Sequence, residues 1–362
     1  MVAKPKGLAK IWREVKRLFG QPFRGKIKTK EKIEELRVCK SKLNAVFGES
    51  NEASKAIGSL LRFYRWKLIL GGDIARFLRV PEPQLGRYNS FAQLAGVDLE
   101  SEISITDEAW ILDGIKLPHA MSSENIWEYE LSDIVFPAYF RRNTEFFDRY
   151  CDVLENDLKD FNEGPYEYEN VCLNEGDVVF DCGANMGMFS AVASRYGCEV
   201  FAFEAIPDII DNYLSKTASM NKNIRILNFA VWDKEETLDF SLTPSNIGAS
   251  SADRVFQETA PYLHQTHLLQ NRKWFSVSAI TLDAFVEKMG IERIDFIKAD
   301  IEGAERNMLR GATRILKEFA PKLSICTYHL PDDPQVLREI ILEANPKYKI
   351  VEKFKKMYAH VP

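Results

Sequence analysis

The C-terminal half of the sequence predicts an α/β fold built on a doubly wound, mostly parallel sheet. From about residue 165, short apolar runs of strand length alternate with amphipathic runs of helix length. The first apolar run enters a glycine-rich turn, and acidic or polar residues follow several of the others. Ligands bind beyond the carboxyl ends of the strands in such sheets, so these residues mark the edge where a site is expected.

The individual elements follow from the apolar runs and their spacing. Strands are expected at 178–182, 199–203, 224–231, 237–242, 273–279, 294–299 and 322–328, and a closing hairpin at 348–354 and 356–361. Helices are expected at 188–196, 208–220, 282–289, 304–319 and 335–344. A polar stretch at about 243–273 separates two of the strands.

The first 160 residues have a different character. Three stretches space their apolar residues as helices do, at 7–20, 29–47 and 51–70, whereas residues 84–150 are weakly patterned. The chain is therefore divided into a basic helical N-terminal segment (1–48), an accessory region of mixed α/β character (49–163) and a ligand-binding domain (164–362). The N-terminal part is expected to be a mainly helical extension of that domain.

Charge is distributed unevenly along the chain. Residues 1–42 hold 14 Lys and Arg against 4 Asp and Glu, whereas the rest carries a net charge of −15. The basic helix at 7–20 fits an anionic membrane surface, the protein's own body or a second subunit. The acidic remainder argues against nucleic acid as a partner.

Composition indicates the compartment and excludes some classes of site. No apolar run approaches the ~18 residues of a membrane-spanning helix, and the N-terminus lacks a secretory signal. We therefore expect a cytoplasmic protein, with peripheral contact at the inner membrane face as a further hypothesis. The six cysteines form no CxxC pair, which indicates reduced thiols rather than a zinc site.

The strand ends carry candidate residues for a nucleoside ligand. After the first strand, Gly183 permits a tight turn, and Gly187 opens a helix whose N-terminal amides favour an anionic group. Asp181 can accept a hydrogen bond from a ligand's ammonium group. Glu204, after the second strand, suits the hydroxyls of a ribose, and Val231, after the third, lies where an adenine ring would.

The remaining strand ends carry candidate catalytic residues. Asp300 and Glu302 follow the strand at 294–299, and close carboxylates cost energy unless cations, hydrogen bonds or a proton offset them. They could orient a substrate hydroxyl, hold a cofactor or bind a metal ion. His329 follows the next strand and could act as a general base. The alternatives are a solvated helix N-terminus for the carboxylates and a structural histidine.

Together these stretches resemble the FkbM family of S-adenosylmethionine-dependent methyltransferases. The resemblance covers about the last 200 residues. It is carried by Gly-Pro-Tyr-Glu at 164–167, Val-Phe-Asp-Cys-Gly-Ala-Asn-Met-Gly at 179–187, Phe-Glu at 203–204, Ile-Lys-Ala-Asp-Ile-Glu-Gly-Ala-Glu at 297–305, and Tyr-His at 328–329 followed by Pro331.

The resemblance implies a class I methyltransferase fold with a seven-stranded sheet, S-adenosylmethionine as cofactor, and methylation of a hydroxyl on a sugar, glycan or related natural product. It implies cofactor contacts at Gly183, Asn185, Gly187 and Glu204, with the acceptor near Asp300, Glu302 and His329. Tyr166 and Glu167 are expected to fold over the cofactor.

Three alternatives remain at this stage. A nicotinamide-dependent dehydrogenase would have GxGxxG after its first strand, whereas this chain has glycines only at 183 and 187. A non-catalytic cofactor-binding or assembly module would not need Asp300, Glu302 and His329. A magnesium-dependent form of the same methyl transfer would use Asp300 and Glu302 as ligands. The acceptor and a homo-oligomeric state are left open.

Overall fold

The structure is a computed structural model that describes residues 37, 103–105, 109–112, 114–118, 147–148, 151, 165–243, 246–252 and 273–362. The chain divides into two compact units, residues 1–101 with 156–158 and residues 102–155 with 159–362. All described residues except Arg37 belong to the second unit. The predicted helices at 7–20, 29–47 and 51–70 and the basic segment 1–42 lie outside the described residues, except for Arg37, which is helical.

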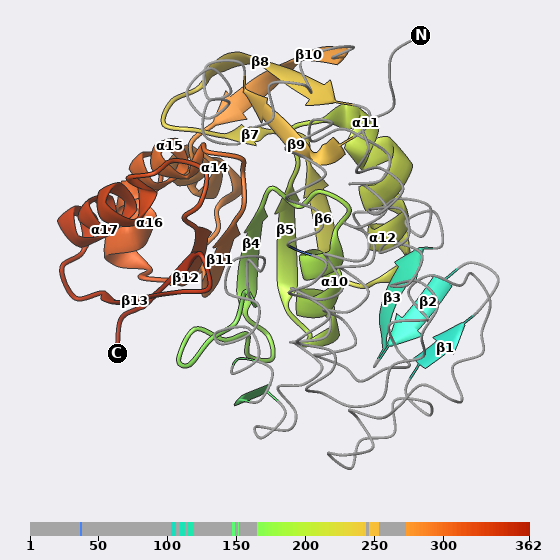
Figure 1. Cartoon of the computed structure of the whole chain (residues 1–362), viewed down its shortest axis with the longest axis horizontal. Helices are drawn as coiled ribbons and strands as arrows, with labels where there is room; N and C mark the ends of the chain where they lie inside the picture. The colour runs from blue at the N-terminus through green and yellow to red at the C-terminus, as the bar shows by residue number, and fades with distance from the viewer. Residues whose placement is uncertain are drawn as a thin grey trace, which may run out of the picture. The chain divides into compact units, whose positions relative to one another are not determined.

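A seven-stranded sheet forms the centre of this unit (Figure 1). Its strands are β4 (Val178–Cys182), β5 (Glu199–Phe203), β6 (Ile224–Leu227), β11 (Phe296–Ala299), β12 (Lys322–Cys326), β13 (Lys349–Lys353) and β14 (Lys356–His360). The order across the sheet is β13-β14-β12-β11-β4-β5-β6, and β14 alone runs antiparallel to its neighbours. The predicted class I methyltransferase fold, with its mostly parallel sheet, is confirmed.

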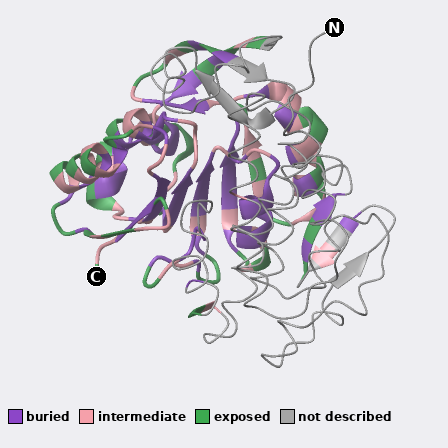
Figure 2. Ribbon diagram, in the orientation of Figure 1, coloured by how far each residue is buried: buried purple, intermediate pink, exposed green. Residues whose placement is uncertain are grey.

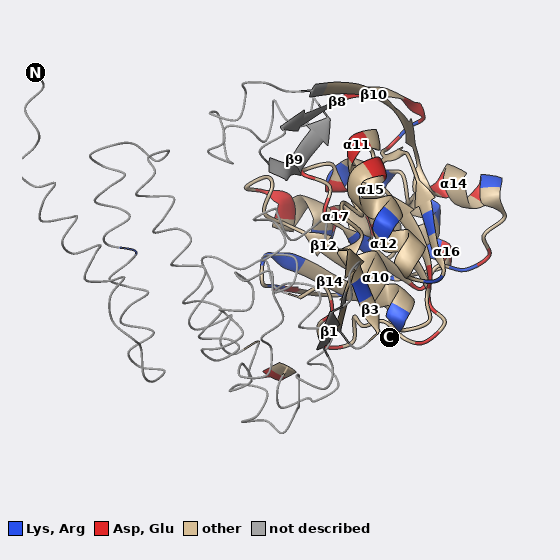
Figure 3. Ribbon diagram, turned by 90° about the vertical axis from the view of Figure 1, so that its right-hand side faces the viewer, with Lys and Arg blue, Asp and Glu red and all other residues tan. Residues whose placement is uncertain are grey.

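Two groups of helices flank the sheet (Figure 1). One group holds α10 (Met188–Arg195), α11 (Pro207–Ile209), a π-helical turn (Ile210–Leu214) and α12 (Ser215–Met220). The other holds α14 (Leu282–Met289), α15 (Glu305–Arg310), α16 (Thr313–Glu318) and α17 (Asp333–Ala344). Figure 3 marks both acidic and basic positions along the ribbon of α14. No described helix has the length and apolarity needed to cross a membrane.

Alternating side chains on the central strands bury both faces of the sheet. On β5, Phe201 and Phe203 belong to the larger core, which packs under α14–α17, whereas Ala202 faces Leu214 and Ala184 in a smaller core. Successive strand residues point to opposite faces, so a strand covered on both sides must be apolar throughout. Figure 2 shows these central strands as almost continuously buried.

Two smaller sheets adjoin the central one. A four-stranded sheet has the order β7-β10-β8-β9 and comprises β7 (Ala230–Val231), β8 (Glu236–Thr243), β9 (Asn246–Ala252) and β10 (Lys273–Ile280). An antiparallel sheet comprises β1 (Ile103–Ile105), β2 (Ala109–Leu112) and β3 (Ile115–Pro118). The backbone of Lys116 on β3 exchanges two hydrogen bonds with the side chain of Asn221, at 3.2 and 2.8 Å, which fixes this sheet beside α12.

Two predicted elements are each divided in the structure, so these predictions were wrong. The strand expected at 224–231 is split between β6 and β7, because the Asn228 side chain donates to the carbonyls of Glu204 and Ala205 and turns the chain away from the central sheet. The helix expected at 304–319 breaks between α15 and α16. The Asp283 carboxylate of α14 accepts from the N–H groups of Arg314 and Ile315 and so caps a new helix there.

Other differences arise where the sequence has little periodicity. Strand β9 lies inside the stretch expected to be polar connection, and β1–β3 lie inside the weakly patterned region. The helical run predicted at 208–220 is helical from Pro207 to Met220 but contains the π-helical turn. The C-terminal hairpin is present as predicted, within one residue at most ends.

Candidate active site

Strand β4 lies where the strand order reverses, because the chain continues to β5 and β6 on one side and later adds β11 and β12 on the other. A crevice opens at such a point beyond the carboxyl ends of the strands. The residues after β4, β5, β11 and β12 therefore meet at one edge of the sheet.

The turn after β4 packs tightly against the ends of both neighbouring strands. Gly183 has a φ of 75°, and a Cβ atom there would lie 2.0 Å from the carbonyl oxygen of Asp300. The N–H groups of Gly183 and Ala184 both donate to the carbonyl of Phe203, at 3.0 and 2.9 Å. Gly187, with a φ of 84°, caps helix α10. Only glycine fits position 183, because any side chain would push the end of β11 away.

A buried ion pair supports this turn from below. Asp181 and Lys298 face each other across β4 and β11, and Nζ of Lys298 lies 3.1 Å from Oδ1 of Asp181. The other carboxylate oxygen of Asp181 accepts from Ser190 at 2.6 Å, and Lys298 also donates to the carbonyl of Gly183 at 2.7 Å. Burial alone would lower the pKa of Lys298, but the Asp181 and Asp300 charges raise it above its usual range. The Asp181 carboxylate therefore contacts Lys298 and Ser190 and stabilises the turn through them.

Glu204 lies at the end of β5, beside the same turn. Its two carboxylate oxygens accept one backbone N–H each, from Asn185 and Ile206, both at 2.9 Å. Burial raises the pKa of Glu204 above its ordinary value, against the effect of these hydrogen bonds. Each oxygen keeps a second lone pair for a further donor. The side-chain oxygen of Asn185 is buried and has no hydrogen-bond partner among the described residues.

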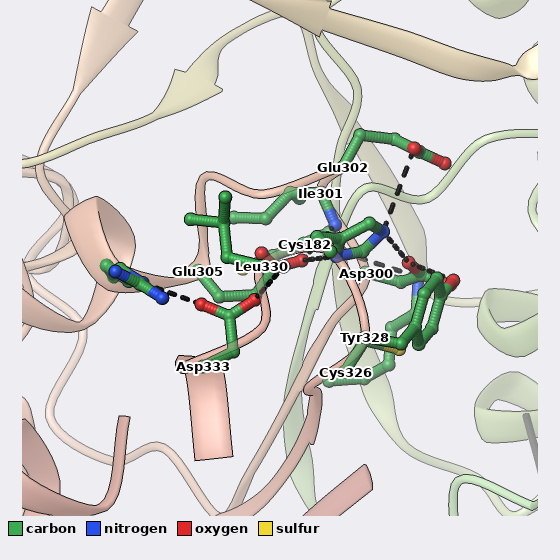
Figure 4. Close-up of polar contacts among 12 residues, drawn as sticks. Cys182, Asp300, Ile301, Glu302, Glu305, Cys326, Tyr328, Leu330 and Asp333 are labelled. Carbon is green, nitrogen blue, oxygen red and sulfur yellow. Dashed lines mark hydrogen bonds and ion pairs between the residues drawn. The ribbon is translucent and has the colours of Figure 1, made fainter. Parts of the chain in front are cut away.

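A second group of charges lies beyond β11 and β12 (Figure 4). Nε2 of His329 is 3.7 Å from Oδ1 of Asp300 and 3.7 Å from Oε2 of Glu302. His329 is fully buried, whereas the two carboxylate side chains are 21% and 22% exposed. Glu302 adopts a left-handed φ of 55°, which is uncommon for a residue with a side chain. The predicted catalytic residues are therefore brought together, and they are partly open to solvent on the carboxylate side.

The other side of the histidine ring is closed by protein. Nδ1 of His329 lies 3.2 Å from Oε1 of Glu305, which is fully buried and also accepts from the N–H of Ile301 at 2.8 Å. Beyond Glu305, Asp333 pairs with Arg306 at 2.6 Å and accepts from the N–H of Leu330 at 2.8 Å. Figure 4 shows Glu305 and Asp333 on one side of the group and Glu302 and Asp300 on the other.

The carboxylates determine the charge of His329. Burial by itself would lower the pKa of this imidazole, but Glu305, Glu302 and Asp300 outweigh burial and raise the pKa to about 10. At neutral pH the ring is therefore protonated in the protein without ligands. A protonated imidazole donates hydrogen bonds and cannot accept a proton.

Two tyrosines fix the Asp300 carboxylate. The hydroxyl of Tyr166 donates to Oδ2 at 2.6 Å, and the hydroxyl of Tyr328 donates to Oδ1 at 3.1 Å. Burial would raise the pKa of Asp300, but the charges of Lys298, His329 and Lys356, together with the Tyr166 hydroxyl, lower it to about 2. Asp300 is thus ionised at any ordinary pH and is a weak base.

Three of the residues that were predicted to contact the cofactor have different surroundings in the structure. Tyr166 lies against Asp300 and so joins the second charged group, with the buried Lys356 4.3 Å from the centre of its ring. Glu167 is buried and accepts from the N–H of Leu173 at 2.8 Å, which stabilises its own turn. The Val231 side chain lies in the hydrophobic core. No described contact brings Val231 to Glu204.

Several site residues escaped the sequence analysis. Lys298 and Ser190 surround Asp181, Tyr328 donates to Asp300, and Glu305 lies 3.2 Å from Nδ1 of His329. One signal was available in the sequence, because Lys298 is a lone charge within an apolar strand. A lysine is almost never fully buried without a partner, which pointed to an acidic residue on a neighbouring strand.

Comparisons with known proteins find similarity in the C-terminal half of the chain. Residues 181–360 match the methyltransferase FkbM domain. These residues belong to the FkbM methyltransferase family. The FkbM domain begins at Asp181, at the end of β4, and therefore contains every strand end described above.

Among curated proteins, the chain is 25% identical over 178 residues to the hexuronic acid methyltransferase AglP of Haloferax volcanii, an alignment that covers 49% of this chain and 66% of that protein. It is 27% identical over 169 residues to the 31-O-demethyl-FK506 methyltransferase FkbM of Streptomyces tacrolimicus, covering 42% and 65%. The alignments thus span slightly less than two-thirds of these relatives.

Among solved structures, the methyltransferase FkbM of Methylobacillus flagellatus KT matches with a TM-score of 0.39 and 20% identity, over 64% of this chain and 62% of that one.

Proposed function

We propose that this protein transfers a methyl group from S-adenosylmethionine to a hydroxyl oxygen of a sugar, a glycan or a related natural product. The observation that carries the proposal is the meeting of three features at one edge of the sheet: the glycine turn, the Glu204 carboxylate and the group of Asp300, Glu302 and His329. The family of residues 181–360 and the names of the two curated relatives support it.

The residues that follow β4 and β5 suit S-adenosylmethionine. The Glu204 oxygens have lone pairs for two ribose hydroxyls, and the unpartnered side-chain oxygen of Asn185 can accept from an ammonium group. Gly183 and Gly187 allow the backbone to approach a ligand. We assign Asp181 a positioning role, since its carboxylate already holds Ser190 and Lys298.

When bound, S-adenosylmethionine supplies an electrophilic methyl group, so that the C–S bond breaks as the new C–O bond forms and the electron pair returns to sulfur. The contribution of the protein is to hold the acceptor oxygen in line with that bond, and positioning of this kind supplies ~7–11 kcal/mol. Asp300 and Glu302 are partly exposed and can receive a hydroxyl group.

The sequence-based hypothesis that His329 is the general base needs revision on physical grounds. A ring with a pKa of about 10 is protonated at neutral pH, and Asp300, with a pKa of about 2, is too weak a base to replace it. We propose that His329, Asp300 and Glu302 together bind and polarise the acceptor oxygen, whose proton leaves to solvent as the C–O bond forms. If His329 alone were the base, kcat/KM would rise about tenfold per pH unit until about pH 10.

Cofactor binding is the first experiment. Calorimetric titration of the full chain with S-adenosylhomocysteine should show binding that Glu204→Gln weakens at least ~10-fold, the equivalent of one strong hydrogen bond. Glu199→Gln is the matched control, because Glu199 lies at the opposite end of the same strand and pairs with Arg225 on the surface. No binding by the wild type would favour the non-catalytic assembly module.

Methyl transfer is tested next, by following S-adenosylhomocysteine formation with a panel of hexuronic-acid oligosaccharides and other hydroxylated acceptors. His329→Ala should abolish turnover while leaving S-adenosylhomocysteine affinity within a factor of about two. Full activity in this variant would remove His329 from the reaction.

A peripheral membrane location is a separate proposal, supported by the basic residues 1–42. Each near-surface Lys or Arg favours an anionic leaflet by about 1 kcal/mol. The full chain should sediment with anionic vesicles and be released by high salt, and equal partitioning to neutral vesicles would contradict the idea.

A further inference from the structure

The space between His329 and its two neighbouring carboxylates has the dimensions of a cation site. Nε2 lies 3.7 Å from both Asp300 and Glu302, and one ligand atom from each residue lies within 4.8 Å of the other two. Two ligands that share a first-row divalent ion, each at ~2.1 Å, lie ~3.0–4.2 Å apart depending on the angle. The contacts of Nε2 are thus too long for hydrogen bonds but fit a shared ion.

The histidine ring points a buried nitrogen into this space. His329 is fully buried, and neither ring nitrogen has a hydrogen-bond partner among the described residues. Its Nδ1 lies 3.2 Å from the buried carboxylate of Glu305, which the N–H of Ile301 holds in turn. Metal-binding histidines regularly have the second ring nitrogen held by a carboxylate, which leaves the first nitrogen as a ligand.

The opposite side of the ring is a poorer place for an ion. Glu305, His329 and Asp333 also lie close enough to share one. However, Asp333 already binds Arg306 and the N–H of Leu330, and Glu305 binds the N–H of Ile301. An ion there would have to displace an arginine from a fully buried carboxylate. Asp300, by contrast, accepts from two neutral tyrosine hydroxyls, and its side chain and that of Glu302 are partly exposed.

We propose that Asp300, Glu302 and His329 bind one divalent ion of the first transition row, with Glu305 positioning the histidine. Imidazole nitrogen suits iron or zinc better than magnesium, which prefers an all-oxygen set, and manganese accepts the carboxylates and serves as a paramagnetic probe. Three protein ligands leave coordination positions open on the exposed side.

This inference rests on the proposed function for its chemical meaning. An ion at this position would bind the acceptor hydroxyl and lower its pKa, so that the hydroxyl proton leaves to solvent before the oxygen attacks the methyl group. The ion takes the place of the Nε2 proton of His329, which leaves to solvent as the metal binds, so the histidine acts as a ligand and not as the base. Glu305 is in this account a positioning residue that acts through His329.

The test uses Mn²⁺ alone and the full chain freed of metals with a chelator. Electron paramagnetic resonance should show one bound Mn²⁺ per chain. Glu302→Gln should weaken binding at least ~10-fold, and Glu305→Gln should weaken it ~10–100-fold through the histidine. Asp332→Asn is the control, because that exposed carboxylate pairs with Arg306 beyond Asp333, and it should leave binding unchanged. Competition with Mg²⁺ should require at least ~10-fold more Mg²⁺ than Mn²⁺.

Absence of binding up to about 1 mM Mn²⁺ (about −4 kcal/mol) would overturn the site, as would equal affinity in wild type and Glu302→Gln. Displacement of Mn²⁺ by an equal concentration of Mg²⁺ would overturn the choice of metal. Titration with S-adenosylhomocysteine, with and without chelator, separates this inference from the proposed function. Normal cofactor binding without Mn²⁺ binding rejects only the ion, whereas Mn²⁺ binding without cofactor binding rejects only the methyl transfer. The same titration shows that Glu302→Gln is folded.

Discussion

Two charged groups start from Lys298 on strand β11 and from Asp300 directly after that strand, and they are built differently. Lys298 meets Asp181 at 3.1 Å in full burial, and Ser190 and the Gly183 carbonyl complete the pair. Asp300 meets His329 at 3.7 Å, with its own carboxylate partly exposed. We call Asp181, Ser190 and Lys298 the closed group, because these side chains contact one another directly. We call Asp300, Glu302 and His329 the open group, because a space remains between their charges.

This difference separates a structural role from a chemical one. Charges that are buried and fully paired hold the backbone in place, because removal of either partner leaves the other unpaired in a medium of low polarity. Charges that are close but not in contact keep their capacity to bind something else. Two charged residues that are only two positions apart therefore have different surroundings, Lys298 within a paired group and Asp300 beside an open space.

The largest effect is expected from breaking the closed group. Lys298→Met leaves the Asp181 carboxylate buried without its cation, which should lower the free energy of unfolding by ~3–5 kcal/mol in urea denaturation. The double variant Asp181→Asn/Lys298→Met should recover part of this loss, since Asn still accepts from Ser190 without a charge. A loss below about 1 kcal/mol in the single variant would show that the pair is not structural.

The next effect concerns Gly183, which lies between the two groups. Gly176 has a similar φ of 78° with no atom near its missing Cβ, so Gly176→Ala should cost only the ~1–2 kcal/mol of a left-handed alanine. Gly183→Ala adds a clash with the carbonyl of Asp300 and should cost ~1–3 kcal/mol more. It should also weaken S-adenosylhomocysteine binding. Equal losses in the two variants would mean that the turn moves freely.

The open group should make stability depend on pH. The pKa of His329 is raised from 6.5 to about 10 in the folded protein, so its contribution is complete below about pH 6.5 and is lost as pH rises through 10. In chelator, the unfolding free energy of wild type relative to His329→Gln should therefore fall by at least ~1.4 kcal/mol between pH 6.5 and 10. A constant difference would indicate a neutral ring.

The smallest effect is expected at the edge of the open group. Tyr166→Phe removes the hydroxyl that donates to Asp300 and should cost about 1 kcal/mol of unfolding free energy. Tyr168→Phe is the control, because the Tyr168 hydroxyl accepts only from Lys353 at 3.1 Å among the described side-chain contacts and lies outside the group. A larger loss in Tyr168→Phe would contradict the importance of the Asp300 contact.

The sequence by itself determined the fold class and the edge of the site. Apolar runs of strand length predict central strands because a sheet covered on both faces needs apolar residues on both, as Phe201, Ala202 and Phe203 have. The motif residues follow strands, and parallel strands end at one edge. The strand at 178–182 and the helix at 282–289 were therefore predicted to the residue.

Only the tertiary structure decided how elements end and which charges pair. The break before α16 depends on Asp283 from another helix, and the division of the strand at 224–231 depends on Asn228 and the end of β5. The partner of Lys298 and the protonation of His329 depend on residues far away in the sequence. The periodicity of a segment shows which of its residues are buried. A hydrogen bond or a shifted pKa depends instead on which other segment lies beside the residue, and the neighbours of a segment are set only when the sheet assembles.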